Sequence, residues 1–244
     1  MVNARNAVEM KSDRVLLVED RIEDRTADAA CAGQELEAQL RQALLRHEFL
    51  LHYQPKVSCK SGCIVGVEAL IRWQHPSRGL VSPGEFMPML EQSGLIVPVG
   101  AWVLRSACKQ ARAWHEAGLG LPGVAVNLSG RQLQMENLFT IVKGALDESG
   151  LEPGYLDLEL TESYLMQDPE EAIATLSRLT AIGVRISVDD FGTGYSSLAY
   201  LKRFPLDALK VDRSFVQDIV VDADDVSITR AVITMAHSLK LDVV

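Results

Sequence analysis

Short apolar segments alternate with amphipathic segments along most of this chain, in the repeat of about 30 residues that is typical of strand, loop and helix units. In one such unit a strand at Leu156–Leu160 is followed by a helix at Pro169–Ile182 and by a second strand that begins at Arg185. Strands joined by a crossover helix pair in parallel. Seven strands in one series, with no Gly-x-Gly-x-x-Gly motif after the first, favour a TIM-type (β/α) barrel over a dinucleotide-binding sheet.

Hydrophobic periodicity and turn residues place the individual elements. Strands are expected at residues 49–57, 64–73, 124–127, 156–160, 185–188, 208–212 and 241–244. Helices are expected at residues 34–47, 97–116, 135–149, 169–182 and 224–239, with a further helix that starts at Pro83. The carboxyl ends of the strands build the active site in barrels of this type, so the side chains at those ends are the candidates for function.

The chain divides into an N-terminal segment and one large domain. Within residues 1–34, Val15–Val18 and the two acidic residues after it are similar to the first strand of a response-regulator receiver domain, but the elements that would follow are absent. We expect this segment to be a tail or linker remnant. Residues 35–244 are long enough for a single barrel with a substantial core.

Composition limits the partners of the chain. A formal net charge of −9 argues against a nucleic-acid polymer, because backbone binding requires clustered Lys and Arg. Since the sequence has neither a signal-like N-terminus nor an apolar run of about 18 residues, a cytoplasmic chain without a membrane span is expected. The cysteines lack the spacing of a zinc site, and reduced thiols are expected at all four positions.

Charged and amide side chains recur near the ends of five consecutive predicted strands. They are Glu68 and Arg72, Asn127, Glu159 and Glu162, Asp189 and Asp190, and Lys210 and Asp212. Any one of them alone is more simply a solvated residue at the rim, but carboxylates within apolar strands need a partner or a cation. Oxygen ligands without histidine or cysteine favour a hard ion, magnesium or manganese.

The adjacent pair Asp189 and Asp190, with the further carboxylates, suffices for two ions about 3.5–4 Å apart, the spacing used in phosphoryl transfer. Lys210 and Asp212 lie on one face of their strand because side chains alternate with a period of two. Lys210 can stabilise negative charge or orient a water, and Asp212 can hold a metal or accept a proton. Arg72 can bind a phosphate through its guanidinium. These side chains together predict metal-assisted phosphodiester hydrolysis.

Six short motifs follow one another along the chain. They are Tyr53-Gln54-Pro55, Glu68-Ala69-Leu70, Asn127-Leu128-Ser129, Glu159-Leu160-Thr161-Glu162, Asp189-Asp190-Phe191-Gly192-Thr193-Gly194-Tyr195-Ser196 and Lys210-Val211-Asp212. In this order they resemble the EAL-domain family, and the resemblance covers about Leu36 to Val244. It implies a modified TIM (β/α)8 barrel with an antiparallel first strand. It also implies hydrolysis of cyclic di-GMP to linear pGpG with magnesium or manganese, in a homodimer.

The resemblance also implies a role for each motif residue. The ligands of one metal ion are expected to be Glu68, Asn127, Glu159 and Asp189. The second ion is expected to bind Asp189 and Asp190, with Asp212 close to it. Lys210 is similar to the family lysine that positions the attacking water, so Lys210, Asp212 and Glu68 are the expected catalytic residues. Gln54 and Arg72 are expected to contact the substrate, and Glu162 is expected to anchor the loop after Asp190.

One point separates this chain from a standard member of that family. Family members continue with a seventh strand that ends in a catalytic glutamate and with an eighth strand, so we expect a barrel that is incomplete at the C-terminus, truncated before the last strand.

Two alternatives to hydrolysis are a catalytically inert receptor of cyclic di-GMP and an enolase-type enzyme that uses carboxylates and a lysine. The adjacent Asp189 and Asp190 and the phosphate-ready Arg72 disfavour the enolase type. Asp190-Phe191-Gly192 spells a kinase motif, but the other kinase motifs are absent.

Overall fold

The structure is a computed structural model, and it describes residues 33–120, 123–193 and 198–244. The tail expected at residues 1–34 therefore lies outside the described residues, apart from its last two positions. Residues 33–45 are helical and lead into the first strand. No helix within the described ranges combines the length and the apolar character that crossing a membrane requires.

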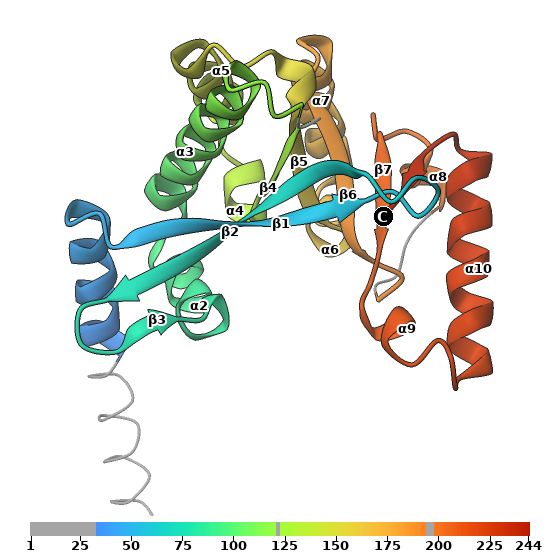
Figure 1. Ribbon diagram of the computed structural model, residues 1–244, viewed down its shortest axis with the longest axis horizontal. Coiled ribbons are helices and arrows are strands. Elements are labelled where there is room, and N and C mark those ends of the chain that lie inside the picture. Colours follow the sequence, from blue (N-terminus) through green and yellow to red (C-terminus); the bar gives the residue numbers. More distant parts are fainter. Residues whose placement is uncertain (1–32, 121–122, 194–197) are drawn as a thin grey trace, which may run out of the picture.

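One sheet organises the fold (Figure 1). Its strands are β1 (Phe49–Val57), β2 (Ile64–His75), β3 (Gly79–Val81), β4 (Val124–Asn127), β5 (Leu156–Thr161), β6 (Arg185–Phe191), β7 (Ala208–Val211) and β8 (Asp242–Val243). The order along the sheet is β1, β2, β4, β5, β6, β7, β8, and β3 pairs with β2. β1 is antiparallel to β2, and each later neighbour from β4 to β8 is parallel. This is the strand order of the expected barrel, and among the described residues β8 pairs only with β7.

Helices connect the strands and cover one face of the sheet (Figure 1). The longer ones are α2 (Pro83–Ser93), α3 (Ile96–Glu116), α5 (Leu138–Ser149), α7 (Pro169–Ala181) and α10 (Ala223–Ser238). The single-turn elements are α4 (Gly130–Leu133), η1 (Pro153–Tyr155), α6 (Glu162–Leu165), α8 (Leu198–Leu201) and α9 (Ser214–Gln217). Asp168 is the N-cap of α7, as the sequence predicts. Its side chain accepts a hydrogen bond from the Glu171 amide at 3.2 Å.

Side-chain alternation divides the central strands into two faces. In β5, Leu156, Leu158 and Leu160 are fully buried in the hydrophobic core shared with the helices. Asp157 and Glu159 alternate with these leucines and therefore point to the opposite face, which carries the polar side chains. The leucine face stabilises the sheet against the helices, at about 1.5–3 kcal/mol for each fully buried side chain. The polar face is left for function.

Two local features differ from the sequence prediction. The helix expected from residue 135 begins at Leu138, because a capping box between Ser129 and Gln132 starts a separate turn, α4. The strand expected to stop before Asp189 continues to Phe191. A register shift after Val188 and a φ of 52° at Asp190 accommodate the extra residues as a bulge.

Candidate metal and phosphodiester site

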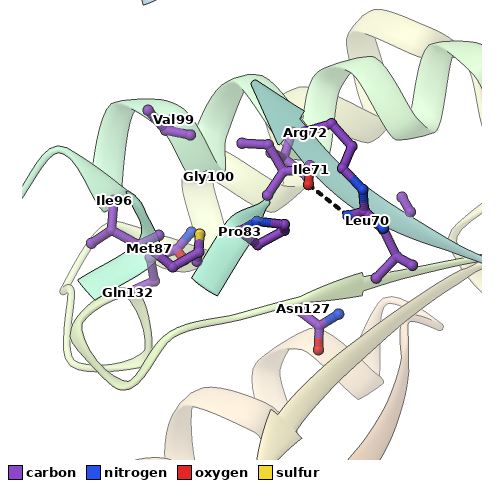
Figure 2. Close-up of a pocket in the computed structure, with 12 residues that line it drawn as sticks. Leu70, Ile71, Arg72, Pro83, Met87, Ile96, Val99, Gly100, Asn127 and Gln132 are labelled. Carbon is purple, nitrogen blue, oxygen red and sulfur yellow. Dashed lines mark hydrogen bonds between the residues drawn. The ribbon is translucent and has the colours of Figure 1, made fainter. Parts of the chain in front are cut away.

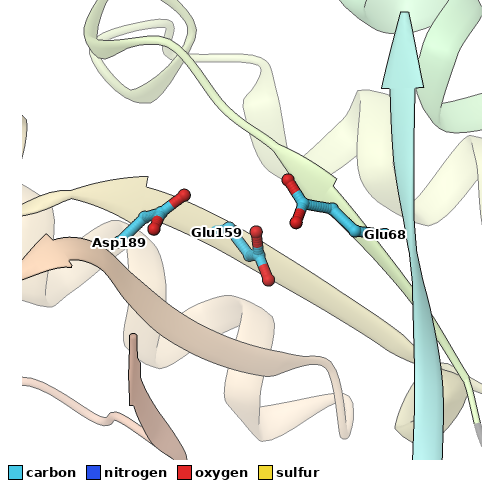
Figure 3. A group of neighbouring side chains, drawn as sticks. All are labelled: Glu68, Glu159 and Asp189. Atoms are coloured by element: carbon cyan, nitrogen blue, oxygen red, sulfur yellow. The ribbon is translucent and has the colours of Figure 1, made fainter. Parts of the chain in front are cut away.

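Three carboxylates from different strands converge on the polar face of the sheet. Glu68 lies on β2, Glu159 on β5 and Asp189 on β6. Each offers an oxygen that lies within 4.8 Å of those of the other two, and Figure 3 shows the side chains in a row across the strands. Glu68 lies inside β2 rather than at its end, because β2 continues to His75 in order to pair with β3. The predicted clustering of these residues is present in the structure.

The Lys210 ammonium lies at the centre of this cluster. Its Nζ donates to Glu159 Oε2 at 2.6 Å, to Asp189 Oδ2 at 2.9 Å and to Glu68 Oε2 at 3.2 Å. Burial by itself lowers the pKa of Lys210, but the carboxylates of Glu159 and Asp189 outweigh burial and raise the pKa above its ordinary value. In this arrangement Lys210 is therefore positively charged.

Glu159 is the most enclosed member of the cluster, with a side chain that is 0% exposed. Burial raises the pKa of its carboxyl, and the ammonium groups of Lys210 and Lys56 act against that rise. Lys56 donates from Nζ to Glu159 Oε1 at 2.5 Å. Both oxygens of this buried carboxylate are therefore paired with cations.

Lys56 was not among the residues predicted from the sequence. It lies on β1, two residues after Gln54, so the period-two rule puts both side chains on one face. This alternation with Gln54 was the signal in the sequence that could have identified Lys56. The partner of Lys56 lies 103 residues away, and only the folded sheet brings the two together.

Asn127, Asp190 and Asp212 surround the cluster. Asn127 donates from Nδ2 to Glu68 Oε1 at 2.8 Å. Asp212 accepts hydrogen bonds from the hydroxyl and the amide of Ser214, and these bonds lower the pKa of Asp212. The pKa of Asp190 is raised by burial and by the charges of Asp189 and Asp212. Asp190 and Asp212 therefore form a second acidic pair beside the first cluster.

Gln54 and Arg72 lie beside the cluster on the β1–β2 pair. Gln54 is exposed and pairs in register with Glu68. Arg72 donates from Nη1 to the carbonyl oxygen of Ile71 at 2.8 Å. Arg72 and Asn127 both line a cavity of about 190 Å³ whose remaining walls are mostly apolar side chains of β2, α2 and α3 (Figure 2).

Glu162 lies at the start of α6, directly after β5, and is 2% exposed. Its Oε2 accepts a hydrogen bond from the Gly192 amide at 3.1 Å. Gly192 follows β6 directly and has a φ of 103°, a conformation that side-chain-bearing residues rarely adopt. The remainder of the predicted loop, residues 194–197, lies outside the described residues.

The Glu162 contact leads to a testable prediction. Glu162→Ala is expected to weaken Mn²⁺ binding by about 10-fold, because partners that hold metal-binding segments typically contribute 10–100-fold in affinity or activity. Mn²⁺ titration of the variant measures the change, with the exposed Glu136→Ala as the matched control. An unchanged dissociation constant would remove Glu162 from the metal site.

The carboxylate cluster fits a divalent cation. Opposite ligands of an ion with bonds of 2.0–2.1 Å lie about 4 Å apart, so small rotations of the three carboxylates suffice. Asp157 and Lys56 extend the cluster, since their charged atoms are 3.7 Å apart. Four carboxylates and two ammonium groups then leave two uncompensated negative charges, which a divalent ion would neutralise.

Sequence comparison assigns the family. Residues 37–244 match the EAL domain. The chain belongs to the EAL domain family. The resemblance inferred from the motifs is thereby confirmed, and so is the fold class, because solved EAL domains share this arrangement of strands and helices.

Several EAL relatives carry a described activity. MucR of Pseudomonas aeruginosa, a bifunctional diguanylate cyclase/cyclic di-GMP phosphodiesterase, is 49% identical over 84% of this chain and 30% of its own length. NbdA of the same species, a cyclic di-GMP phosphodiesterase, is 47% identical over 86% of this chain and 27% of its own length. The chain thus spans less than a third of these longer relatives. A solved structure of the PaMucR phosphodiesterase with c-di-GMP superposes with a TM-score of 0.83, at 48% identity over 86% of this chain and 85% of that one.

Proposed function

We propose that this EAL domain hydrolyses cyclic di-GMP to linear pGpG with magnesium or manganese, most simply with two ions. The convergence of Glu68, Glu159 and Asp189 around one cation position is the observation that carries the proposal. The phosphodiesterase relatives and the c-di-GMP complex of the similar PaMucR structure support the choice of substrate. The homodimer implied by the resemblance and the cytoplasmic location expected from the sequence remain predictions.

The proposed ligands form two sets, one for each ion. Glu68, Asn127, Glu159 and Asp189 would hold one ion. Asp189, Asp190 and Asp212 would hold the other. Such ions polarise a phosphoryl oxygen and make a bound water nucleophilic at neutral pH.

The protein side chains have their own tasks in this proposal. The Lys210 ammonium would stabilise the negative charge that develops on the phosphate and orient the attacking water. Hydrogen bonds from Ser214 lower the pKa of Asp212, so this carboxylate is ionised at neutral pH and can hold the second ion.

Substrate contacts are assigned to the cavity beside the cluster. Its mostly apolar walls suit the flat face of a guanine base, and Arg72 at its edge suits a phosphate. A guanidinium has five N–H donors, so the bond to Ile71 leaves donors for the substrate. Gln54, exposed on the neighbouring strand, is assigned a polar contact to the same ligand.

Arg72→Ala is expected to raise KM for cyclic di-GMP by about 10–100-fold with a smaller change in kcat, because a hydrogen bond to a charged group contributes 1.5–3 kcal/mol. Steady-state kinetics at saturating Mn²⁺ measure both constants, and Arg78→Ala on the β2–β3 turn is the matched control. A KM equal to that of the parent would place the phosphate elsewhere.

A receptor that binds cyclic di-GMP without turnover is the second candidate. Calorimetry and chromatographic product analysis on one sample separate the two candidates. The enzyme proposal predicts pGpG with Mn²⁺ and none with excess chelator. Heat of binding with intact cyclic di-GMP after prolonged incubation with Mn²⁺ would instead support the receptor.

A further inference from the structure

Glu159 has an unusual environment for a metal ligand, because a lysine binds each of its oxygens. Lys210 donates from Nζ to Oε2 at 2.6 Å, and Lys56 donates from Nζ to Oε1 at 2.5 Å. The side chains of Lys56 and Lys210 are 15% and 14% exposed, so both ion pairs are largely shielded from water. A buried carboxylate with both oxygens engaged has little freedom to rotate.

Lys56 also lies near a second carboxylate. Its Nζ lies 3.7 Å from Asp157 Oδ2, and Asp157 lies on the same face of β5 as Glu159. The hydroxyl of the fully buried Ser187 lies 2.8 Å and 2.9 Å from the two Asp157 oxygens. Ser187 also pairs in register with Glu159 across β5 and β6. This chain of contacts holds the Lys56 ammonium beside Glu159.

We propose that Lys56 is a positioning residue that occupies Glu159 Oε1 and thereby presents Oε2 alone to the metal ion. The inference rests on the proposed function, because it assigns Glu159 to the metal. Lys56 touches neither ion nor substrate in this scheme. Its effect is to keep Glu159 a one-oxygen ligand in one orientation, as second partners of metal ligands commonly do.

Removing Lys56 would change the net charge of the cluster as well as the freedom of Glu159. Without its ammonium, the four carboxylates and the remaining lysine leave three uncompensated negative charges instead of two. The attraction for a divalent cation is therefore not reduced. Glu159, however, becomes free to turn and to bind the ion through both oxygens, so the ion is retained in a less productive geometry.

The test is Lys56→Met in the full 244-residue chain, with Lys60→Met on the exposed hairpin turn as the matched control. We expect an Mn²⁺ dissociation constant equal to or lower than that of the parent, an unchanged KM, and a kcat lowered by about 10–100-fold. The electron paramagnetic resonance spectrum of bound Mn²⁺ should also change. Lys56→Arg, which keeps the charge and the N–H donors, should recover most of the loss.

Failure of the inference about Lys56 can be distinguished from failure of the proposed function. A kcat of Lys56→Met within about twofold of the Lys60→Met control, or no recovery in Lys56→Arg, would overturn the inference, since second partners typically contribute at least 10-fold. If Lys56→Met does not fold, Lys56→Ala, which also lacks an N–H donor for Oε1, replaces it with the same expected results. If the parent binds Mn²⁺ but leaves cyclic di-GMP intact, the proposed function fails. The spectrum alone then decides on Lys56, and an unchanged spectrum overturns the inference.

Discussion

Asp189→Asn is expected to lower hydrolysis of cyclic di-GMP by about 1000-fold or more, because a metal ion contributes several kcal/mol to the transition state and each 1.4 kcal/mol is tenfold. Asp189 lies at the point where both proposed ion positions meet. Its Oδ2 lies 2.9 Å from Lys210 Nζ, and its Oδ1 accepts a hydrogen bond from the Asp190 amide. Asparagine keeps one acceptor but lacks the negative charge that a hard cation requires.

Because the Asp189 side chain is 20% exposed, the substitution should leave the fold intact. The measurement is kcat/KM with Mn²⁺, followed by chromatography of the product. Asp147→Asn on the exposed face of α5 is the matched control and should retain parental activity. Asp189→Asn protein that folds and hydrolyses within tenfold of the parent would show that the ions bind elsewhere.

Lys210→Met is expected to destabilise the metal-free protein by about 3 kcal/mol, since removing one partner of a buried ion pair leaves charge uncompensated. Glu68, Glu159 and Asp189 would then converge without the ammonium that now lies among them. A divalent ion can take its place in the variant, whereas in the parent the ion must displace the ammonium, so Mn²⁺ should bind the variant more tightly and reduce the deficit. An ion at 100 times its dissociation constant adds about 2.7 kcal/mol to the protein that binds it. Activity should nevertheless fall by about 100–1000-fold, because the charge that faces the phosphate is lost.

Denaturant unfolding with chelator and with Mn²⁺ measures both parts of the Lys210 prediction. Lys202→Met, at an exposed position near α8, controls for the loss of a lysine. The account requires the stability deficit of Lys210→Met to be larger in chelator than in Mn²⁺. Equal deficits in the two conditions would mean that the ammonium and the metal ion do not share a position.

The longer elements could be predicted from periodicity alone. β1 (Phe49–Val57) has the predicted bounds, and α3 (Ile96–Glu116) starts one residue before its predicted start. β3 (Gly79–Val81) and the turn α4 (Gly130–Leu133) were missed, because three or four residues carry too little periodic signal. Their local hydrogen bonds, such as the capping box at Ser129, decide their structure.

The acidic cluster could also be predicted, since carboxylates stand out in strands as apolar as β5. Two features of the site could not be predicted from the sequence. The bulge at Asp190 depends on pairing between β6 and β7, which local sequence does not specify. The contact between Lys56 and Glu159 joins β1 to β5, strands that are separated in the sheet by β2 and β4. Only the curvature of the assembled sheet brings these two side chains together.

The most direct test of the proposed metal site is the anomalous diffraction of crystals soaked with Mn²⁺. The account predicts a peak among the carboxylates of Glu68, Glu159 and Asp189, with the Asn127 amide beside it and the Lys210 ammonium moved away from its present position. A peak at this place that disappears in Asp189→Asn crystals would support the metal-dependent mechanism. Active crystals with no peak among these carboxylates would contradict it.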